Sequence, residues 1–196
     1  MKLFVSDMDG TLLNSDKRVS KETAQVINSL IGEGMHFSLA TARSIATVKG
    51  IISDLKINLP IILMNGIYVY DPKSEDYLVA NYLNSDTASK IVEQYQSHGI
   101  PPWVFATDAE GRDKVFYKGI YNYAQEIFIT ERLKLNDKRF TLVDQFPDFK
   151  DMKIAHINIM DRKEKLDGLY DSLKLFNNVS CHYYEDVYLK GYYLME

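Results

Sequence analysis

Cysteine is nearly absent from this chain of 196 residues, and so are long hydrophobic runs and any large excess of charge of one sign. The single cysteine, Cys181, cannot form an internal disulfide, which favours a reducing compartment such as the cytoplasm. No apolar run approaches the roughly 18 residues of a membrane span, and the N-terminal run is too short for a signal peptide. With 23 basic against 27 acidic residues the net charge is −4, so neither nucleic acid nor a membrane is an expected partner.

Hydrophobic residues make up 46% of the chain and charged residues 26%, the balance of a globular protein with a packed core. In the first part of the chain, helices are predicted after the capping residue Ser20 and over 44–55. Short apolar runs predict buried strands at 2–6, 36–40 and 61–64. Such strands alternating with helices indicate βαβ units and a parallel sheet, so the fold class is α/β.

The pattern changes after residue 66, where hairpin signals become frequent. Residues 67–79 predict a hairpin, and residues 81–190 predict a separate α+β layer with antiparallel strand pairs. The predicted elements of this layer are helices at 85–97, 121–129 and 162–176, a strand at 153–160, and hairpins at 103–117 and 179–195.

Two carboxylates, Asp7 and Asp9, come directly after the first predicted strand. Ligands of open α/β sheets bind at the carboxyl ends of the strands. Carboxylate oxygens there suit a hard cation such as Mg²⁺. Gly10 allows a sharp turn, and its amide and that of Thr11 can face an anion.

Simpler interpretations compete with this one. Asp7 and Asp9 are also common types of turn residue. A calcium loop fails on spacing, because its sixth and twelfth positions would be Leu12 and Arg18 instead of Gly and Glu. The glycine patterns of dinucleotide-binding and Walker loops are not found after the first strand.

Polar residues also follow the second and third predicted strands. Thr41 and Arg43 come after one strand, and Asn65 with Gly66 after the other. In a parallel sheet these residues would share an edge with Asp7. Taken alone, Thr41 is better explained as a helix cap, and the Asn-Gly pair as a turn.

Taken together, residues 7–12 (Asp-Met-Asp-Gly-Thr-Leu), the strand that ends in Thr-Ala-Arg at 41–43, and the later Asn-Gly pair resemble the haloacid dehalogenase-like superfamily. The resemblance is to its Cof-type phosphatases, which carry a large α/β cap after the third strand. It implies a Rossmann-like, parallel-sheet core over 1–80, an inserted cap over 81–190, and the start of a return to the core over 191–196. The family usually has Thr-Gly-Arg where this chain has Ala42.

The resemblance also implies residue roles. Asp7 would be the nucleophile that forms an aspartyl-phosphate, and Asp9 the general acid and base. Mg²⁺ would be held by the Asp7 carboxylate and the Asp9 main-chain carbonyl. The phosphate-binding positions would be Met8, Gly10, Thr11, Thr41, Ala42, Arg43 and Asn65, with Arg43 and Asn65 either supporting other site residues or lying on the substrate side.

Two family motifs are not matched late in the chain: a phosphate-clamping lysine and an acidic Gly-Asp-x-x-Asn-Asp segment. We therefore expect half of an active site, in a Mg²⁺-dependent phosphatase for a small phosphorylated metabolite such as a sugar phosphate, impaired in this form. A non-catalytic remnant or binding module is the alternative, and a phosphomutase is not separated from a hydrolase. Strand 2–6 would form an exposed apolar edge, covered by a missing C-terminal segment or by a second copy.

Overall fold

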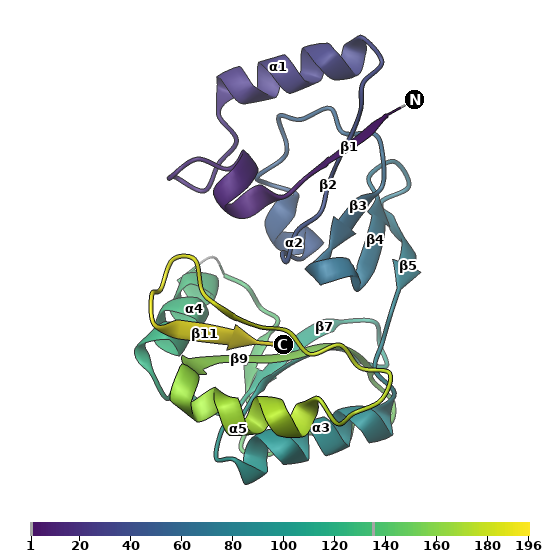
Figure 1. The fold of residues 1–196 in the computed structure, drawn as a ribbon. Coiled ribbons are helices and arrows are strands. Elements are labelled where there is room, and N and C mark those ends of the chain that lie inside the picture. Colours follow the sequence, from purple (N-terminus) through teal and green to yellow (C-terminus); the bar gives the residue numbers. More distant parts are fainter. Residues whose placement is uncertain (1, 135) are drawn as a thin grey trace. The chain divides into compact units, whose positions relative to one another are not determined.

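A computed structural model describes residues 2–134 and 136–196 and divides the chain into two compact units, Met1–Asn81 and Tyr82–Glu196 (Figure 1). We call them unit 1 and unit 2 and describe each by itself. Both contain helices and sheets, so the predicted α/β class holds at this level. Within the described part of the chain, no helix is long and apolar enough to cross a membrane.

Unit 1 is built on strands whose first three run parallel, as the alternating pattern predicts. Its elements are β1 (Leu3–Ser6), a helical turn (Met8–Leu12), α1 (Lys21–Gly32), β2 (His36–Leu39), α2 (Ile45–Val48), β3 (Ile61–Leu63), a second helical turn (Met64–Gly66), β4 (Tyr68–Asp71) and β5 (Asp76–Ala80). β1 pairs with β2 in parallel, and a parallel bridge from Ala40 to Ile62 joins β2 to β3. β3, β4 and β5 are antiparallel, which confirms the predicted hairpin.

The two helices of unit 1 differ in how well their length was predicted. α1 begins after Ser20, whose side chain accepts a hydrogen bond from the Thr23 amide at 3.1 Å, as expected of an N-cap. α2 ends at Val48, whereas the prediction extends it to residue 55. Gly50 weakens the helix there, and the Asn28 side chain of α1 holds the loop at 54–56 by bonds of 2.8 and 2.7 Å.

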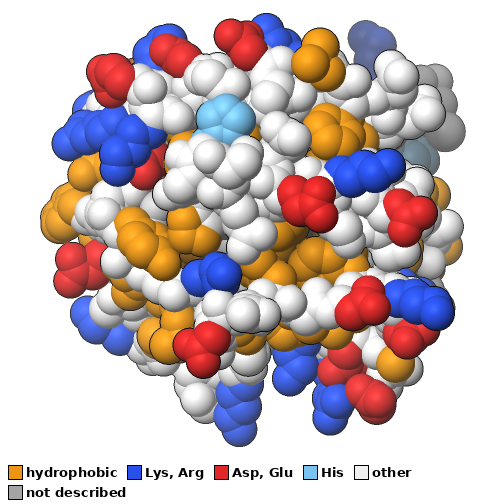
Figure 2. Space-filling view, turned by 90° about the horizontal axis from the view of Figure 1, so that it is seen from below, with side chains coloured by type: hydrophobic (Ala, Val, Ile, Leu, Met, Phe, Trp, Pro, Cys, Tyr) orange, Lys and Arg blue, Asp and Glu red, His pale blue; other side chains and the backbone are white. Residues whose placement is uncertain are grey.

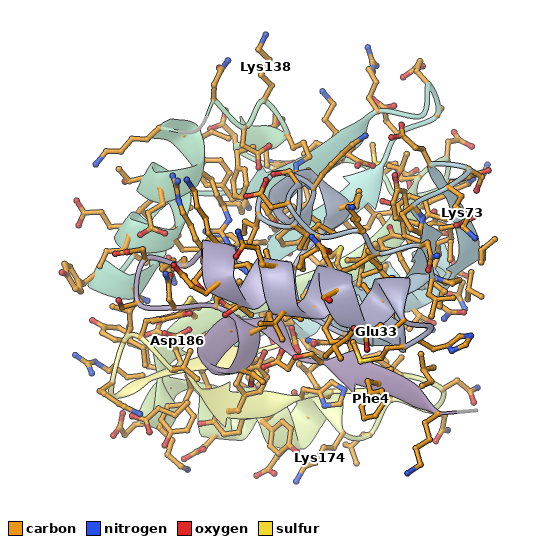
Figure 3. All side chains as sticks on the ribbon, turned by 90° about the horizontal axis from the view of Figure 1, so that it is seen from above. Phe4, Glu33, Lys73, Lys138, Lys174 and Asp186 are labelled. Carbon is orange, nitrogen blue, oxygen red and sulfur yellow. The ribbon has the colours of Figure 1, made fainter. Side chains whose placement is uncertain are left out.

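The first strand is exposed, although its apolar sequence predicts a buried one. Leu3, Phe4 and Val5 are 60%, 51% and 46% exposed, and Phe4 is labelled on this strand in Figure 3. β1 pairs only with β2 among the described residues, so both of its faces and one backbone edge face solvent. The expectation of an exposed apolar edge is therefore confirmed. β5, at the other edge, exposes Tyr77, Leu78 and Val79 in the same way.

Unit 2 contains a six-stranded sheet in the order β10-β11-β9-β6-β7-β8. All neighbouring strands are antiparallel except β7 and β8. Its elements are α3 (Ser85–Ser97), β6 (Trp103–Thr107), β7 (Asp113–Tyr117), α4 (Tyr123–Lys134), β8 (Phe140–Leu142), β9 (Lys153–Arg162), α5 (Lys163–Leu173), β10 (Tyr183–Glu185) and β11 (Tyr192–Met195). The predicted antiparallel α+β layer is thus present.

One continuous hydrophobic cluster forms the core of unit 2. α3, α4 and α5 all pack against the central strand β9, and α3 lies beside α5 (Figure 1). Trp103 of β6 is 1% exposed and stacks on Phe128 of α4 with ring centroids 4.2 Å apart. Seen from the side of α3 and α5, the described side chains of both charge signs are interspersed, without a continuous patch of either sign (Figure 2).

Two expectations for unit 2 need correction, and one strand was not expected. Residues 191–196 do not begin a return to unit 1, because β11 pairs with β9 and β10 inside the unit 2 sheet. α4 starts and ends later than the predicted 121–129, since the Asn122 side chain accepts from the Gln125 amide at 3.0 Å and marks the start of the helix. β8 was not predicted. It is short, it pairs with β7 in parallel, and the connection between the two strands contains α4.

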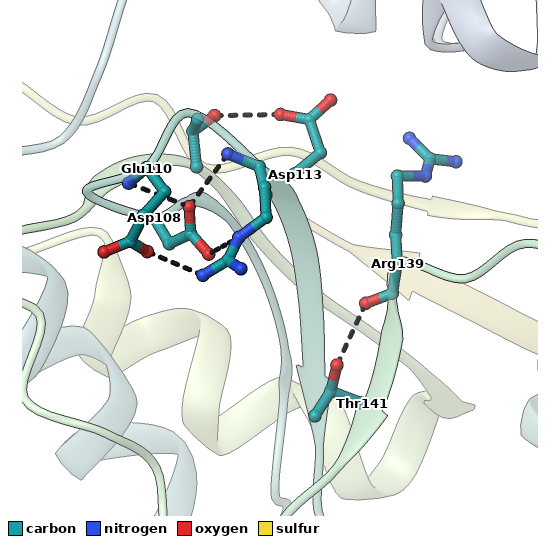
Figure 4. A network of polar contacts seen from close by, with 7 residues as sticks. Asp108, Glu110, Asp113, Arg139 and Thr141 are labelled. Atoms are coloured by element: carbon teal, nitrogen blue, oxygen red, sulfur yellow. Dashed lines mark hydrogen bonds and ion pairs between the residues drawn. The ribbon is translucent and has the colours of Figure 1, made fainter.

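The turn between β6 and β7 is held by a local polar network (Figure 4). The Asp108 carboxylate accepts bonds from the Glu110 amide and from the Arg112 amide and side chain, at 2.8–3.1 Å. Partial desolvation raises the pKa of Asp108, but the bonds from Arg112 outweigh it and hold the pKa below its usual value. Because all of these groups belong to one hairpin and bind one another, we interpret the network as stabilising the turn and not as a binding site.

Candidate active site

All of the predicted site residues lie in unit 1, at the ends of β1, β2 and β3. Neighbouring strand ends are joined by backbone bonds: the Ala40 amide donates to the Ser6 carbonyl at 2.9 Å, and the Thr41 amide to the Ile62 carbonyl at 3.0 Å. The three loops therefore start side by side. This is the position where open α/β sheets bind ligands.

The loop after β1 presents Asp7 to solvent and anchors itself through Met8. Met8 is fully buried, and its carbonyl accepts the Leu13 amide at 2.9 Å, which closes the turn. Gly10 takes a positive φ of 75°, a conformation that glycine adopts without strain. The Thr11 hydroxyl donates to the Asp7 Oδ2 atom at 3.2 Å, so the carboxylate is oriented from within its own loop.

Asp9 is held by an arginine from the next loop. Arg43 Nε donates to Asp9 Oδ2 and Arg43 Nη2 to Asp9 Oδ1, both at 2.7 Å. This is the bidentate arrangement that a guanidinium makes with a carboxylate. The two side chains are only 23% and 24% exposed, so solvent screens the pair partially. The structure thus joins two predicted site residues that lie 34 positions apart.

Thr41 links the second loop to the third. Its side-chain oxygen accepts the Arg43 amide at 3.2 Å, and its carbonyl accepts the Asn65 amide at 3.2 Å. Thr41 is 5% exposed, whereas Ala42 and Asn65 are exposed. The Met64 amide donates to the Arg43 carbonyl at 3.1 Å, so the backbone of all these positions is tied together.

The turn after β3 has an unusual backbone. Met64, Asn65 and Gly66 have φ values of 47°, 52° and 92°, which places three successive residues in the left-handed region. Asn and Gly tolerate this conformation better than other residues, and Met does not. Hydrogen bonds from the Met64 amide to the Arg43 carbonyl and from the Asn65 amide to the Thr41 carbonyl hold the turn in this conformation.

The donor set fits a magnesium ion in part. Mg²⁺ is usually bound by one or two carboxylates, with phosphate oxygens and waters completing the shell. Asp7 offers an exposed carboxylate, but both Asp9 side-chain oxygens accept bonds from Arg43. Over the described ranges, no group of three or more His, Cys, Asp or Glu side chains is arranged to hold a metal.

Two other features that the sequence suggests as reactive, Cys181 and the Lys190-Gly191 pair, lie in unit 2 and have structural roles there. Burial, reinforced by the Glu196 charge, raises the pKa of the Cys181 thiol to about 11, so it is a poor nucleophile at neutral pH. Lys190 and Gly191, the late Lys-Gly pair, lie before β11 in unit 2. There the Gly191 amide donates to Glu185 at 2.7 Å and its carbonyl accepts from Arg162 at 3.1 Å.

The chain belongs to the haloacid dehalogenase-like hydrolase family, whose model matches residues 4–190. This confirms the resemblance seen in the sequence. A putative phosphatase from Buchnera aphidicola is 31% identical over 108 residues, 55% of this chain and 39% of that protein. A 5-amino-6-(5-phospho-D-ribitylamino)uracil phosphatase from Bacillus subtilis is 33% identical over 95 residues, 48% of this chain and 32% of that one. An HMP-PP phosphatase from Serratia proteamaculans is 34% identical over 94 residues, 48% and 34% of the two chains.

Solved structures share the fold over the whole chain. A haloacid dehalogenase-like hydrolase from B. subtilis superposes with a TM-score of 0.75 at 18% identity, covering 100% of this chain and 73% of that one. A subclass IIB sugar phosphatase, BT4131, gives a TM-score of 0.69 at 16% identity, with 100% and 69% covered. The matches to the three curated relatives span only 32–39% of their length.

Sequence reasoning did not find the ion pair between Asp9 and Arg43. It assigned both residues to the site and left Arg43 either as a support for other site residues or on the substrate side, without naming Asp9 as its partner. No local signal reports the pair, because it depends on how the ends of β1 and β2 align in the parallel sheet.

Proposed function

We propose that this chain carries the nucleophile half of a Mg²⁺-dependent phosphoric monoester hydrolase that acts on a small phosphorylated metabolite such as a sugar phosphate. The observation that carries the proposal is Asp7: an exposed carboxylate at the carboxyl end of β1, oriented by Thr11 and followed by a glycine turn. The family membership and the names of the relatives, which include phosphatases of small phosphorylated compounds, support the same reaction class.

In the proposed reaction, an Asp7 oxygen attacks phosphorus, and the bond from phosphorus to the ester oxygen breaks. Asp9 gives a proton to the departing alcohol oxygen. Asp9 then takes a proton from water as the water oxygen attacks the same phosphorus. The bond between phosphorus and Asp7 breaks, which releases inorganic phosphate and restores both carboxyl groups to their starting state.

The phosphoryl oxygens would be bound by groups from the three loops. In the first loop these are the backbone amides at Met8, Gly10 and Thr11, which follow the nucleophile in a tight turn. In the others they are Thr41, Ala42, Arg43 and Asn65, whose backbone is tied together as described. Donors fixed in this way need no reorganisation when charge develops in the transition state.

Mg²⁺ would be held by the Asp7 carboxylate and the Asp9 main-chain carbonyl. When bound, the ion offsets the negative charge between the nucleophile and the phosphoryl group. Because only one carboxylate of this chain is available to it, we propose that affinity for the ion is low in the 196-residue chain.

We also propose that unit 1 corresponds to part of a Rossmann-like core and unit 2 to a cap that sets specificity. The exposed β1 edge would then be covered by further core strands or by a second copy of the chain. Phosphatase activity of the 196-residue chain alone would be impaired. The alternative, a non-catalytic binding module, is favoured by one observation: Asp9 is paired with Arg43 at both oxygens.

The test is hydrolysis of p-nitrophenyl phosphate by the chain and by a version extended with the C-terminal segment of a longer relative. Loss of an electrostatic partner costs about 10²–10³ in rate, so the extended version should be the faster one. Asp7→Asn should abolish hydrolysis in both, and Asp16→Asn, in the same exposed loop, should not. Activity that survives Asp7→Asn would refute the proposed nucleophile, and an inactive extended version would favour the binding module.

A further inference from the structure

The pair between Arg43 and Asp9 occupies both oxygens of the proposed acid and base. Each of its two bonds is 2.7 Å long, and about three quarters of each side chain is shielded from solvent. A carboxylate held in this way cannot at the same time face the ester oxygen of a substrate. The proposed reaction therefore needs Asp9 to leave Arg43 during the cycle.

The Arg43 backbone is fixed by two hydrogen bonds that do not involve its guanidinium. Its amide donates to the Thr41 hydroxyl at 3.2 Å, and its carbonyl accepts the Met64 amide at 3.1 Å. The guanidinium thus emerges from the loop that carries the proposed phosphate ligand Thr41. A change of partner requires only side-chain rotation.

A phosphoryl group is the natural competitor for this guanidinium. Phosphate and carboxylate oxygens both match its planar fork, and a phosphate ester dianion carries twice the charge of a carboxylate. The competitor would be bound next to Asp9, because the amides of Gly10 and Thr11 directly follow Asp9 in the turn.

We propose that Arg43 is an exchange residue: it pairs with Asp9 in the free chain and with phosphoryl oxygens when a phosphate ester binds. The released Asp9 carboxylate then takes up a proton from solvent, which it can transfer to the leaving alcohol oxygen. This inference rests on the proposed function. It assigns Arg43 two successive partners, and it makes ion-pair opening part of substrate binding. A purely structural ion pair would stay closed when phosphate binds.

The test is a double-mutant cycle read by binding of inorganic phosphate. Affinity is measured by NMR from the Gly10 and Thr11 amides of the full chain at a fixed Mg²⁺ concentration. Asp9→Asn should tighten phosphate binding about fivefold, because it removes the competitor of phosphate for Arg43. In an Arg43→Gln background the same substitution should gain clearly less. Asp7→Asn is the matched control: it removes one charge from the same loop, and its effect should be equal in both backgrounds.

A second measurement observes the arginine itself. The Arg43 Nε–H signal should be protected from solvent exchange in the free chain, lose protection in Asp9→Asn, and regain it when phosphate is added. Arg43→Lys keeps the charge without the fork and should retain only part of the Asp9→Asn gain, which guards against misfolding of Arg43→Gln.

The outcomes separate the two proposals. If phosphate binds but Asp9→Asn gives the same gain in both backgrounds, the exchange is refuted and the proposed function stands. If none of the chains binds phosphate, both are refuted. A gain that depends on Arg43, together with recovery of its Nε–H protection by phosphate, supports the exchange.

Discussion

Unit 1 (Met1–Asn81) is smaller than unit 2 (Tyr82–Glu196), and the two units bury their apolar residues very differently. Unit 2 gathers its buried side chains into one continuous cluster around β9 and Trp103. Unit 1 exposes three successive apolar residues on each of its two edge strands, β1 and β5. The candidate site belongs to unit 1, so the proposed chemistry lies in the unit that leaves more of its apolar strand residues exposed.

The edges of the two sheets show the same contrast. The outermost strands of unit 2, β8 and β10, are three residues long, and short edges offer little surface for pairing with another chain. β1 is flanked by β2 on one side only and presents apolar side chains on both faces. The sheet of unit 2 therefore has short edge strands that discourage pairing, whereas unit 1 has an apolar edge strand that can pair with another strand.

The largest expected effect is a core truncation in unit 2. Leu166→Ala, at a fully buried position of α5, should lower the free energy of unfolding by about 4 kcal/mol, because the surrounding cluster cannot collapse onto the cavity. Leu39→Ala in β2, equally buried, should cost about 2 kcal/mol, since exposed neighbours on β1 can relax. Trp103 is the only tryptophan, so its fluorescence in urea follows unit 2, and hydrogen exchange of β2 amides follows unit 1. Equal losses would contradict the contrast.

A pH effect should follow from Glu196 in unit 2. Burial by itself raises the pKa of Glu196, but the His156 bond at 3.0 Å and the Tyr184 hydroxyl hold it below its ordinary 4.5. A lowered pKa gives stability that is present above about pH 4.5 and is lost as pH falls through the folded-state value. Glu196→Gln should remove about 2 kcal/mol at neutral pH and flatten this acid limb. Urea midpoints followed by fluorescence between pH 3 and pH 7 measure both the loss of stability and its pH dependence. If Glu196→Gln leaves the dependence of stability on pH unchanged, the lowered pKa of Glu196 is not its cause.

A matched pair of helix caps offers a smaller effect in each unit. Ser20 caps α1 in unit 1 and Asn84 caps α3 in unit 2, through bonds to the amides of Thr23 and Thr87 at 3.1 and 2.8 Å. Replacement of either cap by alanine should cost about 1 kcal/mol. Hydrogen exchange should register each loss mainly in its own unit. A loss that spreads to both would show that the units unfold together.

The smallest effect on stability is expected at the β1 edge. Phe4→Lys should change the free energy of unfolding by less than about 0.5 kcal/mol, because the side chain is already half exposed. It should nevertheless reduce self-association, since charge on an edge strand opposes pairing. Sedimentation velocity at increasing concentration measures this. Leu175→Lys in unit 2, at a more exposed position outside a strand, adds the same charge and should leave association unchanged.

The sequence predicted elements that depend on local signals. The Ser20 cap, the apolar strands of unit 1 and the hairpin at β4 and β5 all follow from nearby residues and agree with the structure. The loop that carries Asp7 and Asp9 was singled out by the spacing of its own residues, and its catalytic role stays a prediction. Family membership, confirmed by the match over residues 4–190, rested on the same short motifs.

What the sequence did not predict depends on distant partners. The loop after α2 is held by a single side chain of α1, Asn28, and the exposure of β1 depends on which strands flank it. The strand at 192–195 was expected both in a final hairpin and at a return to the core. Its antiparallel pairing with β10 forms the hairpin, and its pairing with β9 places it in the unit 2 sheet. The bond from Arg43 to Asp9 likewise requires two strand ends to be aligned.

The left-handed turn after β3 sets what substitutions this loop tolerates. Because a non-glycine residue in that conformation costs about 1–2 kcal/mol, Met64 stores strain where Gly66 stores none. Replacement of Met64 by Asn or Gly would relieve part of that backbone strain. The same replacement would remove a buried apolar side chain, which opposes the gain in stability. A β-branched residue at any of the three positions would be strained by the backbone conformation itself, even at Gly66, where an added Cβ would meet no atom within 4 Å. Few residue types are therefore tolerated in this turn, even though Asn65 and Gly66 lie on the surface.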